Sequence, residues 1–331
     1  MENIAQDHLT LFAENARIIK KEFFFQNTSE KRLAALLYAQ AGKTIDCEAI
    51  RQCHALIKES TGIFSYFRGD MALSLAALLS LSANPRAVFS QTLQAYHQLK
   101  EEKFYASDFL VIAAYQIAAQ ADAPGYADVI ARTRAFYNGM KARQAFQTGK
   151  DDYILAAMLG LSDLDTEAGG ERIARFYDRL KGKFGSKNSV QALAQVLALG
   201  GADDDVENRV FALRDALRAQ KIRLDKTYTL PVLGILALLA VDVDMIVQDI
   251  GSAQAYLRAQ KGFGAFSLNS QELLLFAAAI TAGKYAQGEK SDMLTATLST
   301  SITNIIIAQQ TAMIMAMTAS SRVAAASAAS N

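Results

Sequence analysis

A unit of about 40 residues recurs seven times along this chain, and this repetition limits the possible folds more than any other feature. Each unit contains a bulky apolar residue, a short polar linker and a strongly apolar segment. The first small residue of each apolar segment lies at Ala34, Ala76, Ala113, Ala156, Ala194, Gly234 and Ala277. Successive separations run from 37 to 43 residues. A period near 40 with two helices per unit is typical of a helical repeat array.

Two further series keep step with the first. A bulky apolar residue precedes each small residue by 9 to 11 positions, at Phe25, Phe67, Phe104, Phe146, Phe184, Leu224 and Phe266. Polar residues that suit helix N-caps lie between the two series, at Thr28 or Ser29, Asp70, Ser107 or Asp108, Asp151 or Asp152, Asn188 or Ser189, Thr227 or Thr229, and Ser270. Each unit is therefore predicted to be a helical hairpin that turns at the polar linker.

The two helices of a unit differ in composition. The first carries charges, whereas the second is mostly Ala, Leu, Ile and Val, as a helix with neighbours on nearly all sides would be. We therefore predict an all-α fold of about seven helical hairpin repeats, forming an α/α toroid or tight superhelix, plus a C-terminal helix. Residues 1–318 are expected to form one domain and residues 319–331 a disordered Ala/Ser-rich tail. The pattern does not determine whether the array closes.

The stretch from Met293 to Ser321 has no charged residue and is long enough to cross a membrane. Asn304, Gln309 and Gln310 interrupt it, and unpaired amides are costly in lipid. We expect no membrane span, and predict instead a helix that caps the array or fills its hollow.

The charge totals limit the possible partners, and the cysteines limit the possible cellular environment. Lys and Arg number 34 against 33 Asp and Glu, so no net field favours nucleic acid or an anionic membrane surface as the main partner. Cys47 and Cys53 lie six residues apart on one predicted helix, which points their side chains in different directions and disfavours a mutual disulfide. A reducing, cytoplasmic location is expected.

The residues that could carry chemistry have simpler structural explanations. Asp151 and Asp152 could act as paired acid and base or hold a divalent cation, but helix capping accounts for the equivalent position in every unit. Cys47, Cys53 and His54 lack the paired spacing of a zinc site. We predict no metal and no cofactor, and we assign no catalytic residue.

Aromatic residues before the apolar helices allow two interpretations. They could line a cavity for an apolar or cationic ligand, or they could pack between neighbouring hairpins, which every repeat requires. The packing interpretation is favoured for Phe64, Tyr66, Phe67, Phe104 and Tyr105.

Parts of the chain and the chain as a whole resemble two known families. Residues 253–281, AQAYLRAQKGFGAFSLNSQELLLFAAAIT, and more faintly residues 180–199 resemble the repeat of protein prenyltransferase β subunits and squalene-type cyclases. That resemblance implies an α/α toroid with a ligand cavity at one mouth, although the cyclase Asp-x-Asp-Asp motif and the prenyltransferase zinc set are absent. The chain as a whole, notably FLVIAAYQIA, TGKDDYILAAMLGLSDLD and the Ala/Ser-rich end, resembles a bacterial family of unknown function found mainly in Firmicutes. This second resemblance implies no particular activity.

Two functions remain open from the sequence. The first is a non-catalytic module that binds a protein partner or a small anionic or apolar ligand. The alternative is an α/α-toroid enzyme acting on an isoprenoid, a saccharide or another anionic small molecule at the rim where the inner helices begin. The predicted rim residues are Arg68, Asp70, Asp108, Asp151, Asp152, Lys187, Asn188, Lys226, Tyr228 and Gln271.

Overall fold

A computed structural model describes residues 2–143, 148–201, 205–288 and 294–329, and within these ranges the regular structure is helical, without strands. The all-α prediction is therefore confirmed. Seven helices form an outer layer: α1 (Glu2–Glu22), α3 (Cys47–Ser60), α5 (Pro85–Glu101), α7 (Tyr126–Arg143), α9 (Thr166–Leu180), α11 (Val206–Ala219) and α13 (Val243–Ala259). Seven form an inner layer: α2 (Thr28–Gln40), α4 (Ala72–Ser80), α6 (Asp108–Gln120), α8 (Tyr153–Leu161), α10 (Lys187–Leu199), α12 (Leu230–Leu238) and α14 (Ser270–Gly288). Short helical turns lie at η1 (Tyr66–Arg68), η2 (Ala123–Gly125) and η3 (Lys150–Asp152).

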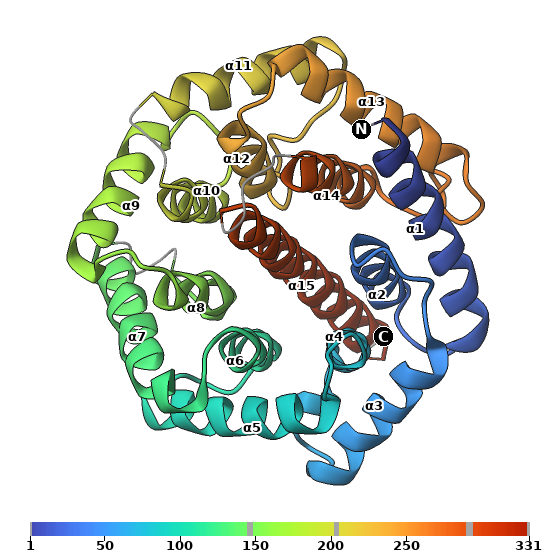
Figure 1. Ribbon diagram of the computed structural model, residues 1–331, viewed down its shortest axis with the longest axis vertical. Helices are drawn as coiled ribbons and strands as arrows, with labels where there is room; N and C mark the ends of the chain where they lie inside the picture. The colour runs from blue at the N-terminus through green and yellow to red at the C-terminus, as the bar shows by residue number, and fades with distance from the viewer. Residues whose placement is uncertain (1, 144–147, 202–204, 289–293, 330–331) are drawn as a thin grey trace.

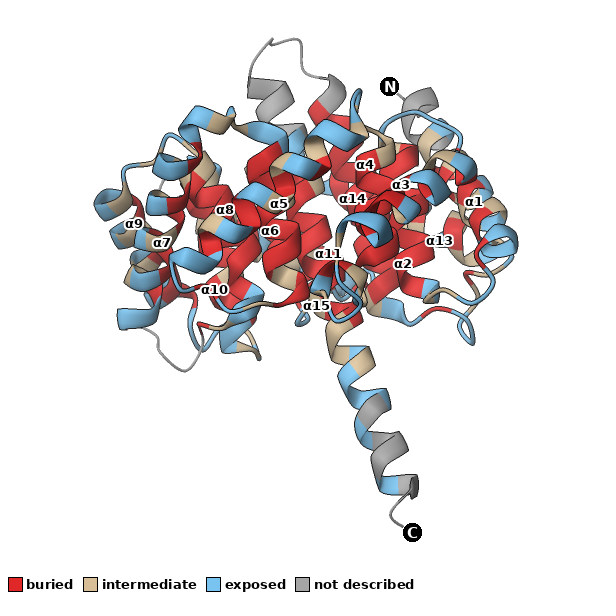
Figure 2. Cartoon of the chain, turned by 90° about the horizontal axis from the view of Figure 1, so that it is seen from below, coloured by how far each residue is buried: buried red, intermediate tan, exposed pale blue. Residues whose placement is uncertain are grey.

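The two layers follow from the two compositions. Outer helices bury one stripe and expose charges on the other side, whereas the described residues of the inner helices are buried almost throughout (Figure 2). Each outer helix packs on the inner helix that follows it, and neighbouring inner helices pack on one another, least closely at α4 and α6. One large apolar cluster runs through all seven hairpins.

The first and last hairpins meet, so the layers form a double ring (Figure 1). The ring of Phe12 in α1 lies 5.2 Å from that of Phe263 and 5.0 Å from that of Phe276, both in edge-on geometry. Arg32 of α2 donates to the carbonyl oxygens of Gly262 (3.1 Å) and Ser267 (2.6 Å), which precede α14. Aromatic packing and a buried cation thus join residues more than 200 positions apart.

Helix α15 (Leu294–Ala329) lies inside the ring (Figure 1). It contacts α2, α6, α8, α12 and α14. Ile307, Ala308 and Ile314 form a small apolar cluster with inner-layer residues that include Leu33, Leu37, Met71, Leu78, Ile112 and Ile154. Of the two positions predicted for this helix, the structure shows the one that fills the hollow. Residues Thr300–Ser321 would suit a membrane span by length and composition, but most of this window is buried inside the ring.

The end of α15 extends beyond the ring on one face (Figure 2). The helix is assigned as far as Ala329, which includes most of the Ala/Ser-rich tail for which the sequence predicts disorder. The division of the chain at residue 318 remains a prediction.

Several predicted caps are displaced by one to three residues. Asn27, rather than Thr28 or Ser29, accepts the amide of Ser29 at the start of α2 (2.8 Å). Ser186, rather than Asn188 or Ser189, caps α10. Asn269, rather than Ser270, accepts the amide of Glu272 (2.9 Å). Ser107 caps α6 as predicted. The displacements arise because an N-cap has non-helical backbone geometry, which composition does not locate to a single residue.

The bulky apolar residues that precede the inner helices fall into a buried and an exposed group. Phe67, Phe104 and Leu224 are buried as wedges between hairpins, and Phe184 is half-buried. Phe25 and Phe266 are fully exposed, and the neighbouring Phe23 and Phe263 are buried in their hairpins instead. Phe146 lies outside the described residues. The packing interpretation is likewise wrong for Phe64, Tyr66 and Tyr105, which are exposed.

Candidate functional site

The ten predicted rim residues all lie near the start of an inner helix, but they do not line one cavity. Helix α15 occupies the middle of the ring, and its Met315 lies against the rim beside η1. The rim residues therefore separate into an acidic arc at α4, α6 and α8 and a basic arc at α10 and α12.

Buried carboxylates in the acidic arc tie neighbouring inner helices together. The Asp152 carboxylate accepts the amide of Gly149 (2.9 Å) and the side-chain amides of Gln191 (2.8 Å) and Gln195 (3.0 Å), which belong to α10. Burial, and then the charge of Asp151, raise the pKa of Asp152 to about 7. Asp152 thus links α8 to α10 rather than capping its own helix, since its carboxylate makes no cap bond to α8. Asp151 itself is exposed.

Glu30 is a rim residue that the sequence did not indicate. It is 4% exposed and accepts the amide of Leu73 (3.0 Å), so it caps α4, whose own N-cap residue Met71 makes no side-chain cap bond. Burial raises the pKa of Glu30 to about 8, although the backbone hydrogen bond opposes this shift. Its position four residues before Ala34 matches that of Asp152 before Ala156. A search for acids in this register would have found it.

A pocket of about 470 Å³ lies between the start of α4 and the start of α6. Arg68, Asp70 and Asp108 line it together with exposed Phe64 and Tyr66. Arg68 donates to the carbonyl oxygens of Lys58 and Thr61 and so closes the end of α3. The structure therefore brings three of the ten predicted residues to one place.

Asp108 is the unusual carboxylate in this pocket. It is 4% exposed, and its Oδ1 has no hydrogen-bond partner among the described residues. A Cβ built on Gly69 would lie 2.5 Å from that oxygen, so the carboxyl group packs against glycine backbone. Burial, and then the charge of Asp70, raise the pKa of Asp108 to about 6.

The basic arc contains four of the predicted residues. Lys187 and Asn188 are exposed at the start of α10. Lys226 lines a pocket of about 510 Å³ with Lys183, where Arg218 and Arg223 both pair with the buried Asp225. Tyr228 is half-buried, and burial, followed by the charge of Asp151, raises its pKa. The tenth residue, Gln271, lies at the start of α14 with a buried Oε1 that has no partner among the described residues.

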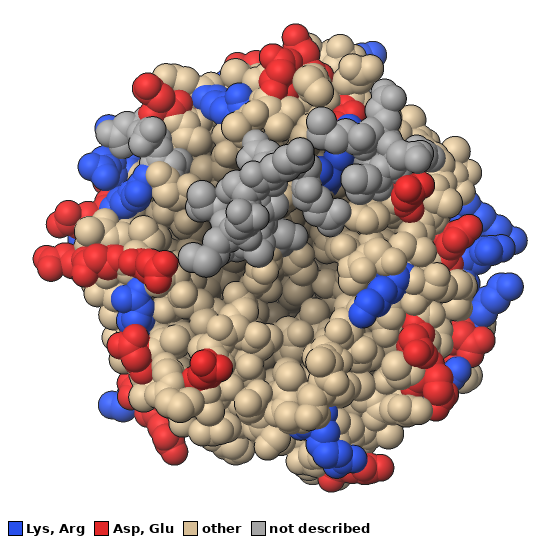
Figure 3. All heavy atoms as spheres, viewed as in Figure 1, with Lys and Arg blue, Asp and Glu red and all other residues tan. Residues whose placement is uncertain are grey.

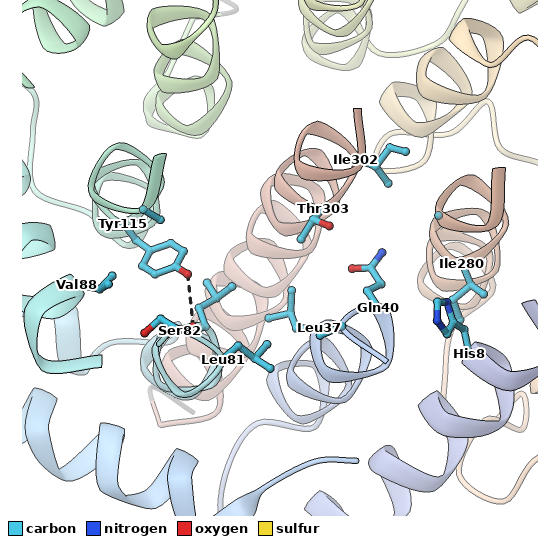
Figure 4. Close-up of a pocket in the computed structure, with 14 residues that line it drawn as sticks. His8, Leu37, Gln40, Leu81, Ser82, Val88, Tyr115, Ile280, Ile302 and Thr303 are labelled. Atoms are coloured by element: carbon cyan, nitrogen blue, oxygen red, sulfur yellow. Dashed lines mark hydrogen bonds between the residues drawn. The ribbon is translucent and has the colours of Figure 1, made fainter. Parts of the chain in front are cut away.

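A different cavity, of about 400 Å³, opens on the opposite face, where the inner helices end (Figure 4). Its wall is mainly apolar and comes from α1, α2, the end of α4, α5, α6, α14 and α15. The apolar side chains are Leu37, Leu78, Leu81, Val88, Ile280 and Ile302, and the polar ones are His8, Gln40, Ser82, Tyr115 and Thr303.

The polar groups of this cavity are only partly paired. Tyr115 donates to the carbonyl oxygen of Leu78 (3.4 Å), whereas the buried Gln40 Oε1 has no partner among the described residues. Burial lowers the pKa of His8, which favours the neutral imidazole at pH 7. Sequence reasoning missed this cavity because it forms only when α14 and α15 close against α2. Gln40, a polar residue at the end of an apolar helix, was the only sign of it.

Metal binding has little support in either region. Within the described ranges, no three His, Cys, Asp or Glu side chains are grouped so that they could hold a metal ion. Cys47 and Cys53 are free and buried.

The chain is thus an all-α protein of helical hairpins around a central helix. A sequence profile described as "Protein of unknown function (DUF4003)" matches residues 16–311, which contain every inner helix and most of the buried part of α15, and the chain belongs to this family. No curated protein and no solved structure matches it. The predicted membership of a family of unknown function is confirmed. The bacterial distribution of that family and the resemblance to prenyltransferase and cyclase repeats remain predictions.

Proposed function

We propose that this protein is a ligand-binding module whose site is the cavity of Figure 4. The observation that carries the proposal is the Oε1 atom of Gln40, a buried acceptor without a donor beside an apolar cavity of about 400 Å³. A buried acceptor without a partner is unfavourable by about 1–3 kcal/mol, and a ligand donor would remove that penalty. Cavities of this size, apolar with a few polar groups, are typical of small-molecule sites.

The lining also limits the class of ligand. It contains no Lys, Arg, Asp or Glu, and its one histidine favours the neutral form. An ionised ligand would lose its hydration without gaining a charged partner. The expected ligand is a neutral, largely apolar molecule with one hydroxyl or amide donor directed at Gln40.

Gly283 supplies a direct test. It lies in α14, lines the cavity, and a Cβ built on it meets no atom within 4 Å. Gly283→Leu should fill the cavity without displacing neighbours, and it should not lower stability, because leucine is a better helix former than glycine. Gly139→Leu in α7 is the matched control, since a Cβ built on Gly139 also meets no atom within 4 Å but lies away from the cavity.

Thermal shift with decanol, indole and cyclohexanol as neutral probes provides the measurement. A bound probe at 100 times its dissociation constant should stabilise the wild type and Gly139→Leu by about 2.7 kcal/mol, and Gly283→Leu should show no shift. An equal shift in all three proteins would place the binding elsewhere. A shift produced by charged probes alone would refute the proposed ligand class.

A second function, acid-base catalysis on a saccharide, is favoured by the unpaired Oδ1 of Asp108. A carboxyl group with a pKa of about 6, beside aromatic side chains in a pocket, is suited to general acid chemistry. Hydrolysis of aryl glycosides should then be lost in Asp108→Asn and retained in Asp151→Asn. Activity that survives Asp108→Asn would exclude this site.

We also propose a cytoplasmic location, which the two free, buried cysteines support.

A further inference from the structure

The exposed apolar side chains of this protein gather on one face. We call the segment that leads from each outer helix into the following inner helix an entry turn, and the face that these turns form the entry face. Seven of the ten large apolar side chains that are exposed in the described chain lie in entry turns: Phe24, Phe25, Ile63, Phe64, Tyr66, Tyr105 and Phe266. Two more, Met317 and Val323, lie on the end of α15.

The end of α15 emerges on this same face. Met315 lies beside the entry turn before α4, whereas Ile302 and Thr303 line the cavity at the opposite ends of the inner helices. The helix therefore runs through the ring toward the entry face and projects beyond it (Figure 2). Residues 317–329 extend about 20 Å at the usual helical rise and contain one charged residue, Arg322.

The entry face also has more exposed basic side chains than exposed carboxylates, although Glu22, Glu59, Glu102 and Asp151 lie there too. Each of the seven hairpins has an exposed lysine in its entry turn or in the last turn of the helix before it: Lys21, Lys58, Lys103, Lys150, Lys183, Lys221 and Lys261. The opposite face has exposed carboxylates at the starts of outer helices, among them Asp46, Asp165 and Asp242. Figure 3 shows acidic side chains around the edge of that face, with Lys and Arg between them. The nearly equal charge totals therefore hide a difference between the two faces in the balance of basic and acidic side chains.

Helix electrostatics explains the lysines but not the apolar residues. Cations near helix C-termini and anions near N-termini are favourable, and the outer helices all run in the same direction across the ring. The helix dipole does not explain the phenylalanines at the tips of the turns, where Phe25 is 97%, Phe64 95% and Phe266 109% exposed. Exposed aromatic and aliphatic tips among lysines are typical of surfaces that enter the interface of an anionic bilayer.

We propose that the entry face docks on an anionic lipid bilayer, with the aromatic tips in the headgroup region and the end of α15 directed into the lipid. Charge complementarity selects this partner. A second copy docked face to face would bring two rings of lysines together and would make the two projecting helices collide. One docked head to tail would place the apolar tips against the exposed carboxylates of the opposite face. A nucleic acid would use the lysines but would leave Ile63, Val323 and the nearly uncharged end of α15 without a partner.

A chain without tryptophan allows a clean assay. Phe64→Trp places the only tryptophan of that variant on the entry face, and Met245→Trp places it at an exposed apolar position on the opposite face. With phosphatidylcholine vesicles containing phosphatidylglycerol, the emission of Phe64→Trp should shift to the blue and that of Met245→Trp should not. Pure phosphatidylcholine vesicles should bind far more weakly, and salt should weaken the binding to anionic vesicles.

Vesicle co-sedimentation of the full chain tests the charges. Lys183→Glu, Lys187→Glu and Lys226→Glu together should weaken partition by at least about 100-fold, since each basic residue near the surface contributes about fivefold. Lys43→Glu with Arg86→Glu, on the opposite face, is the matched control and should bind as the wild type does. Circular dichroism confirms that each variant is folded. Gly283→Leu should also bind normally, because this proposal does not depend on the cavity.

Three results would overturn the proposal. The first is equal affinity for neutral and anionic vesicles, or no affinity for either. The second is binding of an RNA or DNA oligonucleotide that needs the same lysines, with no vesicle binding. The third is a stable dimer in light scattering that Phe64→Ser and Phe266→Ser convert to a monomer, again without vesicle binding.

Discussion

Arg32 should hold the ring closed, and its replacement by methionine tests how. Arg32 lies in α2, the first inner helix, with its side chain 9% exposed, and its Nη1 lies 3.6 Å from Glu272 Oε2 in α14, the last inner helix. Glu272 is 1% exposed, and burial raises its pKa while the charge of Arg32 lowers it. Arg32→Met keeps most of the apolar volume but leaves the Glu272 carboxylate buried without its cation.

Protonation of Glu272 sets an upper limit on the free energy of unfolding that Arg32→Met can remove. A carboxyl group with an ordinary pKa near 4.5 can be neutralised at pH 7 for about 3 kcal/mol, since each pH unit corresponds to about 1.4 kcal/mol. This agrees with the range of about 3–5 kcal/mol for breaking a buried ion pair. At pH 5 the same neutralisation needs less than about 1 kcal/mol. The destabilisation should therefore be several times larger at pH 7 than at pH 5.

Thermal or urea unfolding at the two pH values measures this difference, with roughly 2 °C of melting temperature for each kcal/mol. Adding Glu272→Gln to Arg32→Met should recover most of the stability at pH 7, because the buried charge is then gone. A loss that is equal at pH 5 and pH 7, or that Glu272→Gln does not recover, would refute the ion-pair account. It would leave the hydrogen bonds to Gly262 and Ser267 as the main contribution.

Three further predictions concern stability. The folded-state pKa of Glu30 is about 8 against 4.5 in the unfolded chain, so the folded protein keeps a proton that the unfolded chain releases, and stability should fall as pH rises from 4.5 toward 8. Unfolding curves across pH measure this loss, and Glu30→Gln should remove the part that Glu30 contributes, on the order of 4 kcal/mol between pH 4.5 and 8. An unchanged pH dependence of stability would contradict the raised pKa. Gly160→Ala should destabilise by about 1–3 kcal/mol in urea unfolding, because the new Cβ would lie 2.2 Å from Thr133 Oγ1 and 2.9 Å from its amide nitrogen. Thr133→Ala should relieve only the first contact, so full recovery in the double variant would show that α7 and α8 are less tightly packed. Asp46→Ala should cost about 1 kcal/mol, because Asp46 accepts the amides of Glu48 and Ala49; no measurable loss would show that this cap does not contribute.

Part of the candidate site could be predicted from the sequence. The repeat register located the starts of the inner helices, and the structure places Arg68, Asp70 and Asp108 together in one pocket there. The repeat register could not show that Asp152 accepts hydrogen bonds from Gln191 and Gln195 of the next hairpin, because that pairing depends on the distance between two helices. A cap and a link between repeats have the same sequence pattern.

The cavity of Figure 4 and the entry face depend on contacts across long sequence separations. His8, Tyr115 and Ile302 line one cavity only because α1, α6 and α15 meet around the ring. Charge totals carry no direction, so the separation into a basic and an acidic face becomes visible only when the outer helices are seen to run the same way.

The sequence by itself determined the elements of this protein: the number of hairpins, the charged outer helices, the apolar inner helices and the presence of a further apolar helix. Periodicity and composition suffice for these because they reflect local geometry and burial on one helix. Tertiary structure decided that Phe12 meets Phe263 and Phe276, that α15 fills the ring, and that Phe25 and Phe266 stay exposed while Phe23 and Phe263 are buried. These outcomes depend on the small rotation between successive hairpins, which accumulates around seven units and is encoded in no single one of them.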